Sequence, residues 1–312
     1  MSLTPAISFR ELEALYRKYQ RLNEGAVARY IPELAKAPPD DFAIAVASLD
    51  GSLTSIGESK KPITLQSISK PFVYGLALEL LGTETVRRHV GVEPTGDAFN
   101  SLIELEERSH RPFNPLINSG AIAMSSLIPG ASASERLERI TQLFSAYAGH
   151  AVTVDHAVFL SERSTAHRNR AIAHLLQHFG ALGPCPIDEA LDLYFQQCSI
   201  LMSTEDLALM AATLANGGRH PRTHEQVIAP QGVRDLLSIM FTCGMYDSSG
   251  EWAYTVGLPA KSGVSGGILA VVPGKMGIAT YSPLLDPQGH SVRGGHVFRD
   301  LSQRFRLGIF ET

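Results

Sequence analysis

The sequence predicts an α+β protein in which one antiparallel sheet is built from both ends of the chain, with helices on its faces and a helical subdomain beside it. Strand-like runs occupy residues 42–59 and much of the chain after about residue 252, and helical periodicity dominates between them. We find no internal repeat and no low-complexity linker in the sequence. We therefore expect one domain over residues 1–312, with a sheet lobe of about 1–66 and 250–312 and a helical lobe of about 67–249.

The N-terminal part predicts a helix followed by a hairpin. Residues 9–22 carry apolar side chains at three- and four-residue spacing, which is the pattern of an amphipathic helix. The segment KAPPDD breaks this pattern. The next segment, FAIAVASLDGSLTSIGES, has two strand-like runs on either side of Asp50-Gly51, which predicts a hairpin turn.

A long helical region and a second hairpin follow. The segment SASERLERITQLFSAYAG begins with a capping box from Ser132 to Glu135 and continues with an apolar stripe. Cap residues or glycines bound three further helical segments, DEALDLYFQQCSI, STEDLALMAATLANGG and PQGVRDLLSIMFTCG. GGILAVVPG and KMGIATYSPLLD then predict a hairpin around Pro273-Gly274, and GGHVFRDLSQRF predicts a last helix.

Charge and composition argue against several classes of protein. The 27 basic and 31 acidic residues give a formal net charge of −4, without a basic run that would favour nucleic acid or an anionic membrane. No uninterrupted apolar stretch has the length that a bilayer span needs. The first residues lack the pattern of a secretion signal, and Cys185, Cys198 and Cys243 are odd in number and not in C-x-x-C spacing. These features predict buried, reduced thiols and a cytoplasmic protein.

The segment TLQSISKPF places Ser67 three residues before Lys70, which has two interpretations. In the first, Ser67 caps a helix and Lys70 faces water. In the second, one helical turn brings Lys70 beside Ser67, and a neutral amine takes the proton of the serine hydroxyl. Burial and the positive end of the helix would both lower the pKa of the lysine.

A second segment favours the catalytic interpretation. LPAKSGVSGGILAVVPG places Lys261-Ser262-Gly263 just before a predicted strand. This is similar to the Lys-Thr-Gly element that accompanies Ser-x-x-Lys in serine β-lactamases and penicillin-binding proteins. The Ser-Asp-Asn element of those enzymes is absent from the sequence. The two elements together predict an active-serine acyl-transfer enzyme related to those families.

Seven segments resemble the serine-dependent glutaminases, a β-lactamase-related family that hydrolyses L-glutamine to L-glutamate and ammonia. The resemblance runs nearly end to end and implies a β-lactamase/DD-peptidase-like fold. Its motifs are RYIPELA, LQSISKPF, VGVEPTGDAFNS, NPLINSGAIA, SERSTAHRNRAIAHLL, LDLYFQQCSI and CGMYDSSGEWAYTVGLPAKSGVSGGI.

The resemblance implies a role for each matching position. Ser67 would be the nucleophile and Lys70 its general base. Tyr246 and Tyr30 would lie beside the serine, where either relays a proton or holds the substrate. The backbone N–H groups of Ser67 and Val264 would form the oxyanion hole. The residues implied for the amino-acid end of glutamine are Asn118, Glu162, Asn169 and Tyr194.

Each of these positions also has an ordinary structural explanation. Tyr30 and Tyr194 fall on predicted helices, where a tyrosine usually packs at the edge of the core with its hydroxyl at the surface. Asn118 in NSG suits a turn, and Glu162 beside Arg163 suits a solvated pair. Only the joint pattern of the motifs favours binding roles.

We expect no metal and no cofactor, and L-glutamine as the small-molecule partner. His174 and His178 have a spacing that zinc sites use, but no third ligand is near them in the sequence. We expect neither nucleic acid nor a membrane as partner, and the family precedent implies a homodimer or homotetramer. Two alternatives stay open: another active-serine amidase, such as a penicillin-recognising hydrolase, and a non-catalytic glutamine-binding protein.

Overall fold

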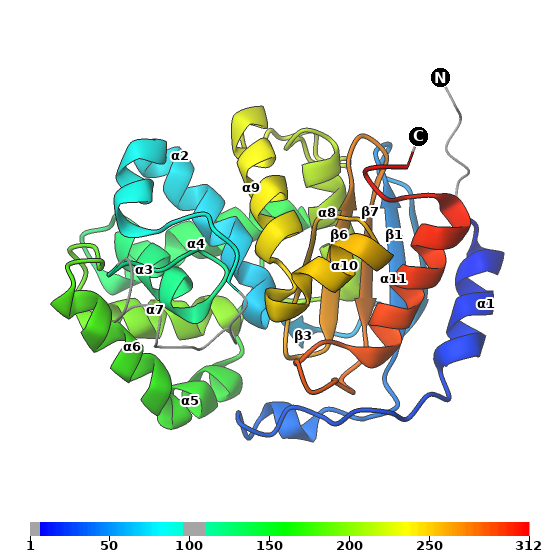
Figure 1. Cartoon of the computed structure of the whole chain (residues 1–312), viewed down its shortest axis with the longest axis horizontal. Helices are drawn as coiled ribbons and strands as arrows, with labels where there is room; N and C mark the ends of the chain where they lie inside the picture. Colours follow the sequence, from blue (N-terminus) through cyan, green and yellow to red (C-terminus); the bar gives the residue numbers. More distant parts are fainter. Residues whose placement is uncertain (1–6, 96–109, 312) are drawn as a thin grey trace.

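The computed structural model describes residues 7–95 and 110–311, and the Gly96–Ser101 part of the VGVEPTGDAFNS motif lies outside them. The main sheet has five strands in the order β2-β1-β7-β6-β5, and every neighbouring pair is antiparallel. Because β1 pairs with β7, the two ends of the chain share one sheet, which confirms the predicted α+β fold class (Figure 1). The strands are β1 (Ala43–Ser48), β2 (Leu53–Gly57), β5 (Ala260–Ser262), β6 (Gly267–Val272) and β7 (Met276–Tyr281).

Both predicted hairpins are confirmed. In the first, Ala47 pairs with Leu53, and Gly51 takes a φ of 84° in the turn. In the second, Val272 pairs with Met276 around Gly274, whose φ is 71°. Glycine adopts this left-handed region without a steric penalty, so both turns depend on residues that the sequence reveals directly.

Helices fill the chain between and around these strands. Ser132 caps α4 through the N–H of Glu135 as predicted, although the Glu135 carboxylate accepts from the N–H of Ala131 instead of completing the box. The helices are α1 (Phe9–Tyr19), α2 (Ser69–His89), α3 (Asn118–Leu127), α4 (Ala133–Ala148), α5 (His156–Thr165), α6 (His167–His178), α7 (Ile187–Cys198), α8 (Thr204–Ala215), α9 (Pro230–Cys243), α10 (Ser249–Thr255) and α11 (Val292–Phe305). No helix of the described residues is long and apolar enough to cross a lipid bilayer.

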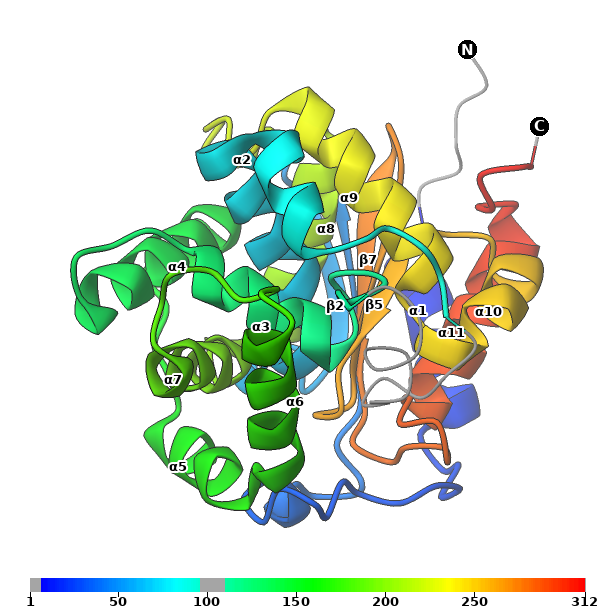
Figure 2. The ribbon, with the colours of Figure 1, turned by 60° about the vertical axis from the view of Figure 1, so that its left-hand side comes forward.

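The sheet is covered on both faces. Helices α1, α10 and α11 pack on one face around Phe42, Ile44 and Phe298. Figures 1 and 2 both place α1 and α11 on the side of the strands that is away from α3–α7. Helix α8 belongs to the helical middle of the sequence, yet it packs across β1, β6 and β7 on the other face.

Small residues bring α8 close to the sheet. The face of the strands toward α8 carries Ala45, Ala47 and Ala279. A Cβ atom on Gly277 would lie 2.2 Å from the carbonyl oxygen of Ala208, so only glycine fits at this contact. The helix therefore seals one face of the sheet at backbone distance, and the same buried cluster continues into α2, α3 and α7.

Candidate active site

The Ser67–Lys70 segment forms a tight turn where the sheet meets the helices. Strand β3 (Ile63–Thr64) leads into the short 3₁₀ helix η2 (Gln66–Ile68), and α2 begins at Ser69. η2 packs against both β5 and α7. Gln66 has a φ of 49°, a left-handed conformation that non-glycine residues rarely adopt and that clusters at functional sites. The turn presents Ser67, which is 8% exposed.

The interpretation of Ser67 as a mere helix cap is wrong. The residue that precedes α2 is Ile68, and no side chain of the described residues caps this helix. Lys70 does not face water either, because it is 1% exposed. Both groups are enclosed, so a structural role at the surface is excluded.

Lys70 is held by two side chains from other segments. Its Nζ donates to Asn118 Oδ1 at 2.6 Å and to the Tyr246 hydroxyl at 3.5 Å. Within residues 7–95 and 110–311, these bonds join Lys70 to Asn118 and Tyr246 and not directly to Ser67. Burial lowers the pKa of Lys70 to about 8, so roughly a tenth of the amine is neutral at pH 7 and the share grows as the pH rises.

Tyr246 links the serine and the lysine. It begins the 3₁₀ helix η4 (Tyr246–Ser248) with a φ of 52°, a second left-handed non-glycine residue beside the site. Burial raises the pKa of Tyr246, and a hydrogen bond with Ser67 lowers it by a smaller amount. The Nζ of Lys261 lies 3.9 Å from the centre of the tyrosine ring. Tyr246 is therefore a protonated phenol in contact with Ser67, Lys70 and a second buried amine.

A cavity of about 330 Å³ opens onto Ser67. It has the size that a free amino acid needs, and six of the predicted site residues line it. The lining residues are Tyr30, Ile31, Gln66, Ser67, Asn118, Glu162, Thr165, Ala166, Arg168, Asn169 and Tyr194.

Asn118 is the hydrogen-bonding centre of this cavity. Its Oδ1 accepts from Lys70 and, at 3.3 Å, from the Tyr194 hydroxyl. Its Nδ2 donates to Asn169 Oδ1 at 3.0 Å. Because both partners of Oδ1 are donors, the amide has one orientation, and it connects Lys70 to the residues expected to bind the amino-acid end of the substrate.

Glu162 is a buried carboxyl group, and one of its oxygens has no hydrogen-bond partner among the described residues. It is 7% exposed, and its Oε2 accepts no hydrogen bond from the described residues. Burial raises the pKa of Glu162 to about 8, and the nearby Lys70 opposes this increase. The alternative of a solvated pair with Arg163 is wrong, since Arg163 points away and bonds Asp192 Oδ1 at 2.7 Å. A buried carboxylate that lacks a partner is suited to receive a cation.

Neither tyrosine of the cavity is a helical residue with its hydroxyl at the surface, which was the ordinary structural explanation for both. Tyr30 does not lie on a helix but in a bend before η1 (Leu34–Lys36), so that prediction is wrong. The residue is 55% exposed, yet its hydroxyl is enclosed near Glu162 and Tyr246, and burial raises its pKa. Tyr194 does lie on α7, but its hydroxyl is buried against Asn118 and not at the surface.

Val264 follows β5 close to the serine turn. The chain approaches the turn at Gly263, where a Cβ atom would lie 2.7 Å from the Leu65 carbonyl oxygen. Val264 does not line the cavity of Ser67 but a neighbouring one of about 310 Å³, together with Ser265. The predicted role of Val264 is to donate its backbone N–H to the oxyanion hole. The position of its side chain in the neighbouring cavity does not bear on that prediction.

The motif analysis left several residues of the site unassigned. Lys261 was part of a recognised motif, but its complete burial over the Tyr246 ring was not predicted. Burial lowers the pKa of Lys261 well below its usual value, and the nearby Lys70 adds to the effect. Gln66 and Arg168 line the cavity and lie within the LQSISKPF and SERSTAHRNRAIAHLL motifs, so their places beside Ser67 and Asn169 were the available signal.

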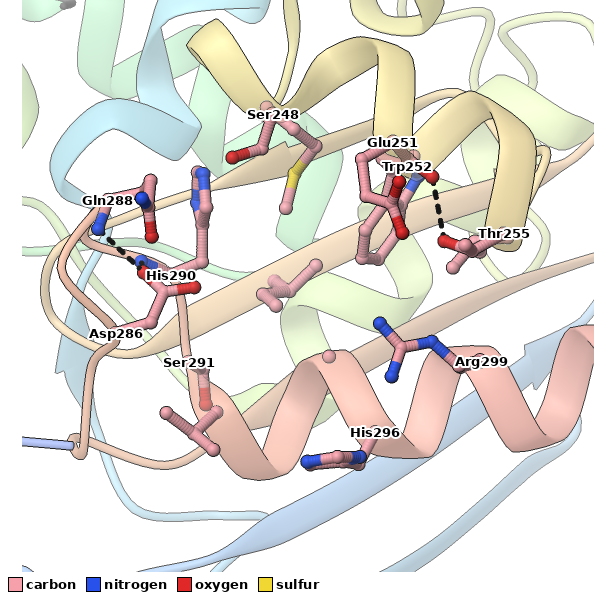
Figure 3. A pocket seen from close by; sticks show the side chains of 15 residues that line it. Ser248, Glu251, Trp252, Thr255, Asp286, Gln288, His290, Ser291, His296 and Arg299 are labelled. Carbon is pink, nitrogen blue, oxygen red and sulfur yellow. Dashed lines mark hydrogen bonds between the residues drawn. The ribbon is translucent and has the colours of Figure 1, made fainter. Parts of the chain in front are cut away.

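A second cavity, of about 400 Å³, lies behind Tyr246 between α10 and α11. Figure 3 shows Asp286, Gln288 and His290 at one end of it, and His296 and Arg299 on α11. The His290 Nδ1 lies 2.9 Å from Ser262 Oγ, and its ring stacks near that of Tyr246. None of the predicted site residues lines this cavity.

The described residues include no group of three or more His, Cys, Asp or Glu side chains that could hold a metal ion. Cys185, Cys198 and Cys243 are free and buried, as the sequence predicts.

These features define a class of protein. A buried Ser-x-x-Lys turn beside an antiparallel sheet, with a second buried lysine on the strand opposite, is typical of active-serine hydrolases that act on amides. The enclosed carboxylate and amides in the same cavity indicate that the ligand is small and polar.

Comparisons with known proteins narrow the class to a family. A family model described as Glutaminase matches residues 25–310. A glutaminase of Trichormus variabilis is 55% identical over 311 residues, with 100% of this chain and 92% of that protein covered. Glutaminase 2 of Clostridium perfringens is 46% identical over 93% of this chain and 96% of that protein.

Solved structures agree with the sequence comparisons. The probable glutaminase ybaS superposes with a TM-score of 0.94 at 43% identity, covering 97% of this chain and 98% of that one. A probable glutaminase of Bacillus subtilis superposes with a TM-score of 0.89 at 38% identity over 98% of both chains. The chain belongs to the glutaminase family, and its fold is the β-lactamase-like fold predicted from the motifs.

Proposed function

We propose that this glutaminase hydrolyses L-glutamine to L-glutamate and ammonia through a γ-glutamyl ester on Ser67. One observation carries the proposal: the unpartnered carboxylate of Glu162 shares a cavity of about 330 Å³ with Ser67. Free glutamine carries an ammonium group, which this carboxylate would pair, and a side-chain amide that reaches toward the serine.

Substrate binding would use both ends of the cavity. Glu162 receives the ammonium, and the hydroxyl and amide groups of Tyr30, Asn169 and Tyr194 receive the α-carboxylate and the rest of the amino-acid end. One known neighbour, 42% identical with a TM-score of 0.94, is described as Mglu in its glutamate form. Glutamate is the product that the proposed reaction releases.

Acylation would begin with attack of Ser67 Oγ on the side-chain carbonyl carbon of glutamine. The serine proton passes to neutral Lys70, by way of the Tyr246 hydroxyl that contacts both residues. The N–H groups of Ser67 and Val264 stabilise the oxyanion. The C–N bond then breaks, and the proton held by Lys70 returns through Tyr246 to the leaving nitrogen, so that ammonia departs.

Deacylation would reverse these roles with water as nucleophile. Water attacks the γ-glutamyl ester and loses a proton to the same lysine, and that proton returns to Ser67 Oγ as the ester bond breaks. L-glutamate and the free serine result. No metal or organic cofactor takes part in this scheme.

The test measures ammonia release from L-glutamine and L-asparagine, and ring opening of a penicillin, by the wild type and by Ser67→Ala. We expect release from glutamine only with Ser67 present, with the Ser67→Ala variant folded and still able to bind glutamine, because the hydroxyl is not part of a helix cap. Turnover of the penicillin without ammonia release from glutamine would indicate a penicillin-recognising hydrolase. Tight glutamine binding without turnover by the wild type would indicate a non-catalytic binding protein.

The wider setting of the enzyme stays a prediction. The family resemblance implies a homodimer or homotetramer, which sedimentation or light scattering of the purified protein measures. The cytoplasmic location is likewise a prediction, which rests on the N-terminal sequence and the cysteine pattern.

A further inference from the structure

The strained turn that carries Ser67 is braced by buried side chains that do not line the cavity. The Ser69 hydroxyl donates to the Gln66 carbonyl oxygen at 2.8 Å. Gln197 Nε2 donates to Ser69 Oγ at 3.3 Å. The hydroxyl of Ser125 donates to Gln197 Oε1 at 3.1 Å and shares its proton with the Ala121 carbonyl oxygen.

These bonds form a chain with a single direction. The Ser69 hydroxyl donates its one proton to the Gln66 carbonyl oxygen, so Ser69 Oγ accepts the bond from Gln197 Nε2. The amide oxygen of Gln197 then accepts from the Ser125 hydroxyl. Ser69, Ser125 and Gln197 are completely buried, so water does not compete for these bonds. The chain connects the start of α2 to α7 and α3, which are the helices that also carry Tyr194 and Asn118.

The carbonyl at the end of this chain belongs to the peptide that links Gln66 to Ser67. In a trans peptide the C=O and the N–H point in opposite directions within one plane. Holding the Gln66 carbonyl therefore also sets the direction of the Ser67 N–H. The left-handed φ of 49° at Gln66 is unfavourable for a non-glycine residue, so the turn needs such external support to persist.

We infer that Gln197 is a positioning residue of the active site, which acts through Ser69 to orient the Gln66–Ser67 peptide and with it the Ser67 N–H of the oxyanion hole. This inference rests on the proposed function, in which that N–H stabilises the transition state. Gln197 does not line the cavity of about 330 Å³, so its effect on ground-state substrate binding should be small.

The experiment measures kcat and KM for glutamine in Gln197→Met, Ser69→Ala and the double variant. Methionine keeps the approximate shape of glutamine and removes both of its hydrogen bonds. We expect each single variant to lower kcat about 10- to 100-fold, a part of the loss typical for a missing oxyanion donor, with KM changed less than about threefold. The double variant should be no slower than the slower single variant, because both substitutions break one chain.

Ser126→Ala is the matched control. Ser126 is the neighbour of Ser125 on α3, is equally buried, and also donates to a helix carbonyl, that of Ala123 at 2.7 Å, but it has no bond to Gln197. The Ser126→Ala variant should keep kcat within about twofold of the wild-type value, even if its melting temperature is lower. Ser125→Ala keeps the Gln197–Ser69 bond and should show an intermediate loss of kcat.

Three results would overturn the inference. These are an unchanged kcat in folded Gln197→Met, an increase in KM alone, and losses in the two single variants that add in the double variant. If Gln197→Met does not fold, the comparison of Ser125→Ala with Ser126→Ala tests the inference instead. Equal kcat values in these two variants would also overturn the inference. Failure of the proposed function is a separate result, since it appears as turnover of glutamine by Ser67→Ala.

Discussion

Buried ionisable groups around Ser67 are the central feature at the scale of single residues. Two lysines and one glutamate are buried within a few side chains of Ser67, and the pKa values of Lys70 and Glu162 both move to about 8. Burial is the largest cause in both cases, and it favours the neutral form of each group. If Glu162 receives the substrate ammonium as proposed, that positive charge would favour the ionised carboxylate against the effect of burial.

This arrangement predicts the pH dependence of activity. In the proposed mechanism, binding of the substrate ammonium requires ionised Glu162 and proton abstraction requires neutral Lys70, so the active form has lost both protons. With both pKa values at about 8, kcat/KM should rise with pH between about 6 and 9, with a limiting slope near two on a logarithmic plot. Initial rates of ammonia release at low glutamine concentration, taken at each pH, measure kcat/KM.

The Glu162→Gln variant is the control for that profile. It removes one of the two titrating groups, so its slope should fall toward one while its absolute rate is lower. A wild-type profile that is flat from pH 6 to pH 9 would contradict the assignment of both groups.

Glu162→Gln should weaken substrate binding and at the same time make the folded protein more stable. We expect KM to rise at least tenfold, because a neutral amide does not pair the substrate ammonium. The free energy of unfolding should increase by roughly 1–4 kcal/mol at pH 8, because the variant no longer holds a carboxyl group whose ionisation burial disfavours. Denaturant titrations at several pH values measure the gain.

The sign of the pH effect follows from the direction of the shift. Between its ordinary pKa of 4.5 and about 8, Glu162 is ionised in the unfolded chain but protonated in the folded one, so wild-type stability falls as pH rises through this interval. The advantage of Glu162→Gln should therefore grow from pH 4.5 to 8 and vanish below pH 4.5. An advantage that does not depend on pH would have another cause.

Among the secondary-structure elements, the contact between α8 and the sheet is the most demanding. The helix backbone lies so close to the strands that a Cβ atom on Gly277 would be 2.2 Å from both Ala208 O and Ala212 N. Neither obstacle is a flexible side chain, so the helix or the strand would have to move. This contact joins the helical middle of the chain to the sheet.

Gly277→Ala should destabilise the protein by about 3 kcal/mol, through overpacking at this contact. The measurement is the free energy of unfolding in urea. Gly295→Ala on α11 is the matched control, since a Cβ atom there meets nothing within 4 Å. Alanine is the better helix former, so the control should gain up to about 1 kcal/mol. Equal effects of the two substitutions would contradict the close approach of α8.

One large buried cluster connects the sheet to the helical part of the molecule. This cluster includes strand residues of β1, β6 and β7 and residues of α2, α3, α4, α7, α8 and α9. A second cluster on the opposite face contains Trp252, which is buried and donates to the Leu258 carbonyl oxygen at 2.9 Å. The two clusters share the sheet, so loss of either one exposes the other.

The shared sheet predicts a single unfolding transition. Trp252 is the one tryptophan of the sequence and reports on the second cluster, whereas circular dichroism at 222 nm reports mainly on the helices. The two signals should give the same midpoint within about 1 °C in thermal unfolding. Midpoints separated by several degrees would instead show that the sheet and the helical part unfold independently.

Local signals account for what could be predicted from the sequence. Asp50-Gly51 and Pro273-Gly274 predict their hairpins because turn geometry depends on the turn residues themselves. Helical periodicity and caps predict helices such as α4 and α11 for the same reason. The motif residues also reveal the chemical groups of the site, since those groups are written directly in the sequence.

Apart from the incomplete capping box of α4, the wrong or missing predictions discussed above concern long-range contacts. Tyr30 was expected on a helix, but it lies in a bend whose shape depends on packing against distant segments. The position of α8 on the sheet depends on glycine and alanine residues of strands on both sides of it in the sequence. The hydrogen bonds of Gln197 with Ser69 and Ser125 join three helices, and no local pattern indicates them.

The amino-acid sequence alone predicted most of the strands and helices and named the candidate reactive groups, because these depend on residues near one another along the chain. Only the tertiary structure decided that Lys70 and Glu162 are buried in one cluster, that Tyr246 connects Ser67 to Lys70, and that the serine lies on a strained turn. The physical reason is that burial, and therefore pKa and hydrogen-bond strength, is a property of the neighbours that folding brings together from distant parts of the chain.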